Sequence, residues 1–584
     1  MKLRILRLGS LLLVLCVSVV NAFSLDREAF TFASYDLNVR AEPEQQRLAV
    51  RGKIVLRNDS STPQKVAVLQ ISSSLDWRAI KTGDEPLQFV SQTYTSDIDH
   101  TGALSEAIVT LPQTITPKGT VELEIAYEGV ITLDATRLTR LGTPTPQANS
   151  SDWDQISTKF TAVRGAGYVA WYPIATEAAS LADAPDLFEV LGRWKLREMD
   201  STMHLEVAVP IAEDDEKPEL MVNATACPAA REAAHQFLAD CTYRSLGVIV
   251  PTFVIADYEA NDRATIEVHY LRGHAAAANS YADAAEKVVP LITDWFGAPH
   301  SKAETADLND ASAAPFESGP FLLMPLLTPL SGTDSKLAGL VAAHQLTHAA
   351  FSSPRAWINE GLAHFAQALY LENARGRQAA LDYMGLHRSA FAGSDGGNQK
   401  PTTPPRSEDE INHSLVNTYD EERYRSKAMC VWWMLRDMIG DQALKKVIAS
   451  YRPEQDKEPS YMPRLIQAQT QRDLEWFFDD WVYRDRGLPD FKVESVFPRK
   501  TLKEAYMLTI TVANLGTTGA EVPLTVKSGK GETTKRIEVR AQSKTVIRLE
   551  VPALPAEVVV NDGNVPESDT TNNVFKVEAG DAAK

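Results

Sequence analysis

The sequence has no excess of basic residues. Its 584 residues include 59 Lys and Arg against 77 Asp and Glu, which gives a formal net charge of −18 at pH 7. This balance argues against a polyanionic partner such as nucleic acid, and it identifies no substrate. Long hydrophobic runs are also missing after residue 22, where no stretch approaches the roughly 20 apolar residues of a membrane-spanning helix. We therefore expect no membrane span in the mature protein.

The first 22 residues have the pattern of a secretory signal peptide. Three basic residues, Lys2, Arg4 and Arg7, precede an apolar run from Leu11 to Val20, and Ala22 ends a small-residue cleavage site. The pattern predicts a secreted, periplasmic or otherwise extracytoplasmic protein. The alternative is an N-terminal anchor that is retained without cleavage.

Only four cysteines are present, and three of them follow the signal peptide. Cys227 and Cys241 are predicted to form a disulfide, which suits an oxidising compartment; two unpaired thiols are the alternative. Cys430 lies in an apolar helical run, so we expect a buried small hydrophobic residue there and not a nucleophile.

The chain is long enough for several domains, each with its own core. Residues 23–273 are rich in short segments with strand character. The segment from Val121 to Tyr127, for example, alternates in the way that a half-buried strand does. Many short strands separated by turns predict antiparallel, sandwich-like sheets in a β-rich N-terminal domain.

The pattern changes near Ala275. A helical segment ends at Trp295-Phe296-Gly297, and further helical segments continue to residue 490. From Phe491 onward, alternating segments return and resemble a small immunoglobulin-like β-sandwich. The region from Asn561 to Asn573 lacks the regular ligand spacing of a calcium loop and predicts a turn rich in Asn and Asp. The predicted divisions are therefore 1–22, 23–273, 274–490 and 491–584.

The strongest chemical signal lies between residues 339 and 367. His344 and His348 are four residues apart in a segment without a helix breaker, so both imidazoles project from one face of a helix. Pro354 ends this helix, and Glu360 follows on the next one. Two histidines and a glutamate provide three protein ligands for zinc and leave a fourth position open, which is typical of catalytic zinc sites.

A carboxylate is missing beside the first histidine. Zinc peptidases with two histidines at this spacing carry a glutamate after the first, which acts as the general base on the metal-bound water. Here the position is Gln345, whose amide can hydrogen-bond to a water but cannot take its proton at neutral pH. The metal-binding half of the motif is present, and the base is replaced.

With these elements in order, residues from about Phe23 to Phe491 resemble a gluzincin metallopeptidase of the M1 aminopeptidase type. The most specific match is the segment from Trp357 to Ala363, with Asn-Glu-Gly at its centre. The resemblance implies a multidomain α+β protein with a mainly helical, thermolysin-like catalytic domain. It also implies one Zn2+ per chain, held by His344, His348 and Glu360, and a peptide or protein as substrate or ligand.

The chain departs from the family pattern at other positions as well. The link between His348 and Glu360 has eleven residues, which is shorter than in M1 enzymes and similar to other peptidases of this clan. The Gly-x-Met-Glu-Asn segment that holds a substrate's amino group is not evident, and Glu317 is the candidate for its carboxylate. The transition-state tyrosine is expected two residues before a Lys-Ala pair; Arg425 stands there, and Tyr424 is the candidate.

Two functions from different classes remain open. One is a secreted zinc metallopeptidase, aminopeptidase-like, that hydrolyses peptide bonds with a zinc-activated water. The other is a catalytically impaired pseudopeptidase that binds peptides or a protein partner, because Gln345 replaces the base. His364, one turn after Glu360, is expected either to orient a zinc ligand or to face solvent. If no zinc binds, the ligands persist as buried, hydrogen-bonded polar groups.

Overall fold

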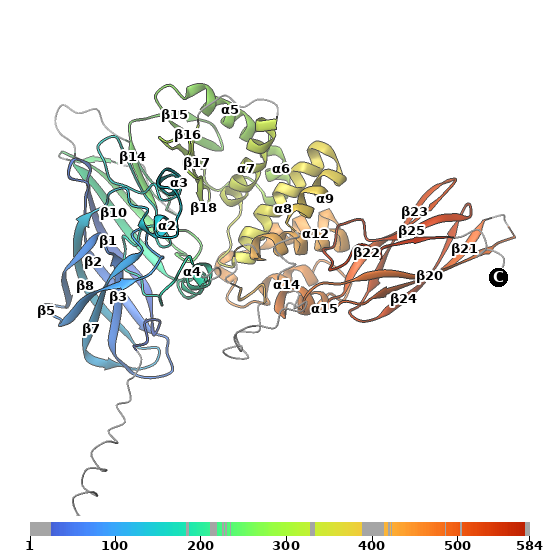
Figure 1. Cartoon of the computed structure of the whole chain (residues 1–584), viewed down its shortest axis with the longest axis horizontal. Helices are drawn as coiled ribbons and strands as arrows, with labels where there is room; N and C mark the ends of the chain where they lie inside the picture. Colours follow the sequence, from blue (N-terminus) through green and yellow to red (C-terminus); the bar gives the residue numbers. More distant parts are fainter. Residues whose placement is uncertain are drawn as a thin grey trace, which may run out of the picture.

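The computed structural model has three regions that follow one another along its long axis (Figure 1). It describes residues 25–182, 186–210, 219–224, 227, 231–233, 235–326, 333–387, 414–418, 421, 423–484, 486–502 and 505–577. The predicted signal peptide lies outside these residues. The β-rich N-terminal region and the helical middle region are confirmed, and strands return in the C-terminal region. None of the described helices is both long and apolar enough to cross a membrane.

The N-terminal region is built around an eight-stranded sheet with the order β12-β13-β10-β1-β2-β8-β4-β5. Its strands are β1 (Phe30–Glu42), β2 (Arg47–Asn58), β4 (Leu75–Thr82), β5 (Glu85–Pro86), β8 (Thr120–Val130), β10 (Thr202–Pro210), β12 (Arg231–Ala233) and β13 (Gln236–Tyr243). The predicted strand lies in β8, where Leu123, Ile125 and Tyr127 are buried. One pairing differs from the expected antiparallel pattern: β1 and β10 are parallel. The long connection between them brings the chain back to the end of the sheet at which β1 begins.

Two smaller sheets complete this region, with the orders β3-β7-β6 and β11-β14-β9. Their strands are β3 (Gln64–Ser72), β6 (Phe89–Thr95), β7 (Ala103–Ile115), β9 (Phe160–Val163), β11 (Glu219–Val222) and β14 (Phe253–Ala256). The helices here are η1 (Pro43–Gln45), α2 (Thr136–Thr139), α3 (Thr145–Ser151) and α4 (Asp186–Arg197). Helix α4 lies on the side of the region that faces the helical region (Figure 1).

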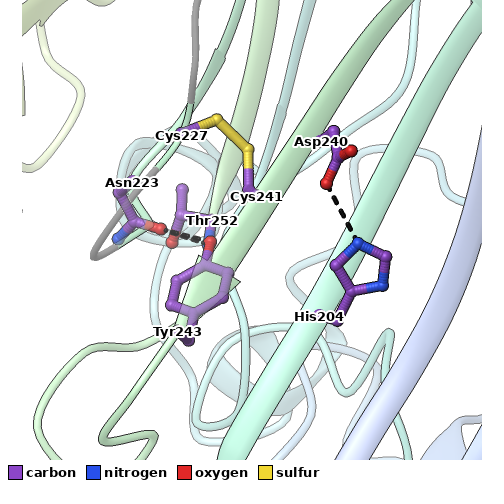
Figure 2. Close-up of a disulfide and its surroundings, with 7 residues drawn as sticks. All are labelled: His204, Asn223, Cys227, Asp240, Cys241, Tyr243 and Thr252. Carbon is purple, nitrogen blue, oxygen red and sulfur yellow. Dashed lines mark hydrogen bonds and ion pairs between the residues drawn. A yellow bond between two sulfur atoms is a disulfide. The ribbon is translucent and has the colours of Figure 1, made fainter.

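The predicted disulfide between Cys227 and Cys241 is confirmed, and Figure 2 shows it beside a buried polar cluster. In this cluster Asn223 donates from Nδ2 to a backbone carbonyl (2.9 Å). Its Oδ1 accepts from the Tyr243 hydroxyl (2.9 Å) and from the Thr252 N–H (2.8 Å). Asn223 begins an Asn-x-Thr glycosylation sequon, but an amide that is buried and bonded in this way cannot carry a sugar in the folded protein.

The middle region contains a five-stranded sheet with the order β15-β16-β17-β19-β18. Its strands, which come from both sides of residue 273, are β15 (Tyr258–Asp262), β16 (Ile266–Leu271), β17 (Ala303–Asp307), β18 (Phe316–Ser318) and β19 (Phe321–Met324). β16, β17 and β19 run parallel, and β18 folds back antiparallel to β19. β18 is therefore an edge strand.

Helices pack against this sheet and against one another (Figure 1). They are α5 (Ala275–Glu286), α6 (Val289–Phe296), α7 (Thr333–Ala350), α8 (Ala356–Arg375), α9 (Arg377–Leu386), the π-helical turn η2 (Arg423–Lys427), α12 (Ala428–Ile439), α13 (Asp441–Ser450), η3 (Pro453–Gln455), α14 (Tyr461–Gln467), α15 (Glu475–Phe478) and a second π-helical turn, η4 (Asp479–Tyr483). The predicted helix end is confirmed, since α6 stops at Phe296 and Gly297 has a positive φ of 91°. Cys430 is buried in α12, as expected, and forms no disulfide.

The C-terminal region consists of two antiparallel sheets, β20-β21-β24 and β23-β22-β25-β26. Their strands are β20 (Phe491–Lys500), β21 (Tyr506–Asn514), β22 (Ala520–Ser528), β23 (Gly531–Val539), β24 (Lys544–Val551), β25 (Pro555–Val560) and β26 (Val574–Lys576). The predicted turn is confirmed: Asn561 Oδ1 accepts from the N–H groups of Gly563 (3.0 Å) and Val565 (3.3 Å).

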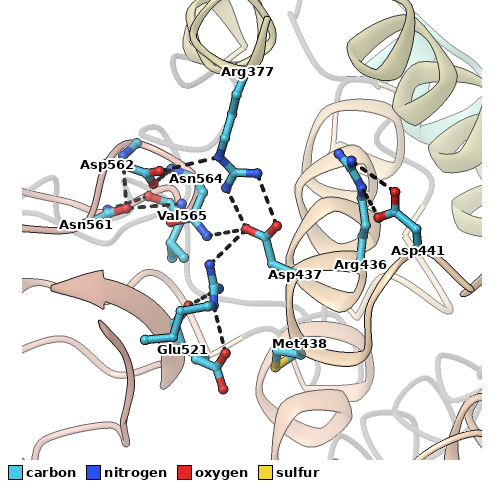
Figure 3. A network of polar contacts seen from close by, with 12 residues as sticks. Arg377, Arg436, Asp437, Met438, Asp441, Glu521, Asn561, Asp562, Asn564 and Val565 are labelled. Carbon is cyan, nitrogen blue, oxygen red and sulfur yellow. Dashed lines mark hydrogen bonds and ion pairs between the residues drawn. The ribbon is translucent and has the colours of Figure 1, made fainter. Parts of the chain in front are cut away.

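A polar network around Asp437 of α12 fastens the C-terminal region to the helices (Figure 3). Arg377 of α9 donates two hydrogen bonds to the Asp437 carboxylate (3.2 and 2.7 Å). From the C-terminal region, Arg536 Nη1 (3.1 Å) and Asn564 Nδ2 (3.0 Å) donate to the same carboxylate. One acidic side chain thus joins three segments that are distant in the sequence.

Asp437→Ala is expected to lower the free energy of unfolding by about 2 kcal/mol, because two partly buried guanidinium groups lose their carboxylate. Urea unfolding of the full chain measures the change. Asp441→Ala is the matched control, since Asp441 is a more exposed partner of Arg436 (2.8 Å) on the neighbouring helix. The control is expected to cost less than about 1 kcal/mol. Equal losses in the two variants would contradict a stabilising role for the network.

Candidate metal centre

Two consecutive helices bring the three predicted zinc ligands together. His344 and His348 lie one turn apart on α7, and both are buried (5% and 7% exposed). Their Nε2 atoms are 3.1 Å apart. On α8, Glu360 places Oε2 3.6 Å from His344 Nε2 and Oε1 3.5 Å from His348 Nε2. Ligands at zinc bond lengths of about 2.0–2.1 Å are separated by roughly 3.3–3.4 Å in a tetrahedron, so these spacings fit zinc.

The electrostatics of the three groups also suit a cation. Burial lowers the pKa of His344 well below its usual value and lowers the pKa of His348 as well, which favours the neutral imidazoles that bind metals. Burial opposes ionisation of Glu360, but the permanently charged Arg425 favours the carboxylate, and the pKa of Glu360 lies below its usual value. Two imidazole lone pairs and an ionised carboxylate therefore face one another.

The neighbours of Glu360 explain the Asn-Glu-Gly segment. Asn359 Oδ1 accepts from the N–H of Ser353 in the link between the helices (3.1 Å), and its Nδ2 lies 3.3 Å from Nδ1 of His348. Gly361 allows α12 to approach, because a Cβ at residue 361 would come within 2.6 Å of the Ala428 Cβ. The Asn359 amide therefore holds the link between the helices and contacts His348. The absence of a side chain at Gly361 allows α8 and α12 to pack closely.

Gln345 does not face the histidine pair. It is fully buried between α7 and the five-stranded sheet. Its Nε2 donates to the backbone carbonyls of Glu304 (2.9 Å) and Pro320 (3.0 Å), and its Oε1 accepts from the Tyr281 hydroxyl (2.9 Å). The residue in the base position therefore packs α7 against the sheet through hydrogen bonds of its amide.

Glu317 lies directly beside the histidines. It is on β18, which a turn at Gly319 (φ 61°) joins to β19. Its Oε2 is 3.7 Å from His344 Nε2, and its Oε1 is buried without a hydrogen-bond partner among the described residues. Burial and the charge of Glu360 raise the pKa of Glu317 to about 8. A second carboxylate thus stands against the histidine pair, a feature that the sequence indicates only weakly.

Tyr424 and Arg425 lie in the π-helical turn η2, and both line the cleft above the centre. A π turn holds one more residue than an α turn, which accommodates the extra residue between Tyr424 and Lys427. Arg425 Nε donates to Glu360 Oε2 (3.2 Å), and its guanidinium also pairs with Glu421. The position expected for the tyrosine therefore presents a cation to the predicted zinc ligand.

His364 lies against the same cluster, one turn beyond Glu360 on α8. Its ring centroid is 4.7 Å from that of His344, and both of its ring nitrogens are buried without a partner in the described part of the chain. Among the described residues, two groups of three have ligand atoms within 4.8 Å of one another: Glu317, His344 and His348, and also His344, Glu360 and His364. Orphaned nitrogens and convergent carboxylates are the donor set that a zinc ion satisfies.

A cleft of about 570 Å³ opens above this centre, between the N-terminal region and the helices. His344, His348 and Glu360 line one side. Helix α4 supplies an apolar wall that includes Phe188, which is 57% exposed. A cleft of this size accommodates a short peptide or a ligand of similar volume.

A buried His-His-Glu cluster from two successive helices, at the side of such a cleft, is the arrangement of a metallopeptidase centre. The family model for the peptidase family M1 domain matches residues 333–481, which include α7, α8 and η2. This part of the chain is an M1-type metallopeptidase domain, and the resemblance seen in the sequence is confirmed over residues 333–481. None of the curated proteins matches the chain. Peptidases of this family depend on zinc and act on peptides.

Proposed function

We propose that this protein is a zinc-binding pseudopeptidase of the M1 type, which holds a peptide or an extended protein segment in its cleft without efficient hydrolysis. The observation that carries the proposal is the environment of Gln345, whose amide donates to two backbone carbonyls away from the histidine pair. Loss of a positioned general base costs roughly 10²- to 10⁴-fold in rate.

His344, His348 and Glu360 would hold the zinc, which would act as a Lewis acid toward an oxygen atom at its fourth position. The spacing of their ligand atoms, 3.1 to 3.6 Å, supports this assignment. Arg425 holds one oxygen of Glu360 and thereby fixes the orientation of this carboxylate. His364 would support His344 by ring contact.

Peptide binding is supported by the edge strand. Phe316, Glu317 and Ser318 of β18 line the cleft, and β18 pairs with a neighbour on one side only. An extended peptide can add to such an edge through main-chain hydrogen bonds. Phe188, which lines the same cleft, offers an apolar contact for one of its side chains.

The test measures binding and turnover separately on the zinc-loaded mature protein. A library of fluorescent short peptides is titrated for binding by polarisation, and the same mixtures are analysed for cleavage products by mass spectrometry. We expect saturable binding and cleavage too slow to distinguish from His344→Ala. Turnover that disappears in His344→Ala, or no binding by any peptide, would refute the proposal.

A zinc metallopeptidase of aminopeptidase type is the second candidate, and the position of Glu317 favours it. A carboxylate 3.7 Å from His344 Nε2 could receive the free amino group of a substrate. This reading expects cleavage of peptides with a free N-terminus and none after N-acetylation, which the same mass-spectrometric assay detects.

The proposal also covers location and domain organisation. The Cys227–Cys241 disulfide supports an extracytoplasmic protein, in agreement with the predicted signal peptide. We propose that the predicted ranges 23–273, 274–490 and 491–584 correspond to an N-terminal domain, a catalytic-type domain and an immunoglobulin-like module, with β15 and β16 joined to the catalytic-type domain through their sheet. The two antiparallel sheets of the last region support its assignment.

A further inference from the structure

We infer that Glu317 is a fourth protein ligand of the metal and closes the centre to solvent. The inference rests on the zinc-binding part of the proposed function and extends it. Three protein ligands leave a position for water, whereas four protein ligands are typical of structural zinc sites. A closed centre gives the absence of efficient hydrolysis a second cause, independent of Gln345.

The spacing of the ligand atoms supports this assignment. Glu317 Oε2 lies 3.7 Å from His344 Nε2, nearly the same distance as Glu360 Oε2 from that atom, 3.6 Å. The ligand atoms of Glu317, His344 and His348 all lie within 4.8 Å of one another. Glu317 thus approaches His344 about as closely as Glu360 does, from a different element of the fold.

The Glu317 carboxylate lacks other compensation. Its Oε1 is buried, and no described residue donates to it. Arg425, a cation that lines the same cleft, is already engaged with Glu360 and Glu421. A buried carboxylate oxygen without a hydrogen-bond donor is unfavourable. When both are ionised, Glu317 and Glu360 carry two negative charges, the number that one Zn2+ neutralises.

The hairpin that carries Glu317 is held in place from both sides. Ser318 Oγ accepts from the N–H of Val250 (2.9 Å), and the carbonyl of Pro320 accepts from Gln345 Nε2 (3.0 Å). Glu317 itself pairs with Leu322 of β19. Gln345 is therefore a positioning residue: it braces the turn that presents Glu317 to the histidines.

Zinc titration of the metal-free full chain, in competition with a chelating dye, tests the inference. Glu317→Gln is expected to weaken zinc binding by about 100-fold or more. Glu219→Gln is the matched control, because Glu219 contacts His269 (3.0 Å) outside the centre. The zinc affinity of this variant should equal that of the wild type. Metal-free Glu317→Gln should unfold at a temperature no lower than that of the wild type, because no described residue donates to Oε1 of Glu317. A folding defect would lower this temperature.

Cobalt-substituted protein reports whether the centre is closed. Added azide should leave the visible spectrum of the wild type unchanged and should alter that of Glu317→Ala, in which a coordination position becomes free. An azide-sensitive wild type, or wild-type zinc affinity in Glu317→Gln, would overturn the inference. Zinc affinity that survives His344→Ala would instead contradict the zinc site of the proposed function, so the two failures can be told apart.

Discussion

Gln345→Glu is expected to destabilise the protein and to leave it without peptidase activity, although it restores the His-Glu-x-x-His motif. The new carboxylate would face the backbone carbonyls of Glu304 and Pro320, which now accept from the Gln345 amide at 2.9 and 3.0 Å. Two hydrogen bonds become repulsive contacts at a fully buried position, which costs about 3 kcal/mol. Because burial raises the pKa of such a carboxyl group above about 4.3, the loss should increase as the pH rises above that value.

Urea unfolding at pH 5 and pH 8 measures this effect, and a peptide-cleavage assay with zinc present measures activity. Gln469→Glu is the matched control, because Gln469 is exposed and the same substitution there should change stability by less than about 0.5 kcal/mol. A stable Gln345→Glu variant that cleaves peptides, and that loses this activity when His344→Ala is added, would show that residue 345 reaches the metal after all.

Local patterns in the sequence were sufficient for much of the fold. The period-two alternation in β8 and the glycine stop after Phe296 are both consequences of local geometry, and both are found in the structure. The parallel pairing of β1 with β10 was not predictable in this way. It depends on where a connection of more than a hundred residues brings the chain back, which no short window contains.

The same limit applies to the centre. The four-residue spacing of His344 and His348 sets their common helix face, so their convergence follows from helix geometry alone. The direction of the Gln345 side chain depends on the sheet packed against α7, and the approach of Glu317 depends on a hairpin of that sheet. The sequence motif shows that Gln345 replaces the base. Only the packing shows that its amide bonds to backbone carbonyls of the sheet.

The replacements are mutually consistent. Gln345 braces the hairpin, the hairpin places Glu317 at the histidines, and Arg425 compensates Glu360. Gln345 thus acts through hydrogen bonds to the scaffold, and Arg425 acts through its ion pair with Glu360. Because these residues are linked through shared partners, we expect the effects of substitutions at Gln345, Glu317 and Arg425 on stability and zinc affinity to be non-additive when they are combined.

His344→Ala is expected to abolish zinc binding while the protein remains folded. His344 contacts His348, Glu360 and Glu317, so its removal deprives every proposed ligand of a partner at the metal. Elemental analysis of purified protein should find about one zinc per chain in the wild type and almost none in the variant. Zinc at 100 times its dissociation constant stabilises a protein by about 2.7 kcal/mol, so the zinc-dependent rise in melting temperature should also vanish.

His204→Ala is the control for this measurement. His204 lies between the carboxylates of Asp36 (2.7 Å) and Asp240 (3.0 Å) on the surface of the N-terminal sheet, and Figure 2 shows it on the Asp240 side. Because this second histidine–carboxylate cluster is exposed and has only one imidazole, its loss should leave the zinc content unchanged. If zinc is lost in His204→Ala and retained in His344→Ala, the metal binds at the N-terminal sheet, and the proposed centre on α7 and α8 is wrong. Zinc in neither wild type nor variant would leave the pair on α7 as buried polar groups of the scaffold, and peptide binding would then have to be explained by β18 and α4 alone.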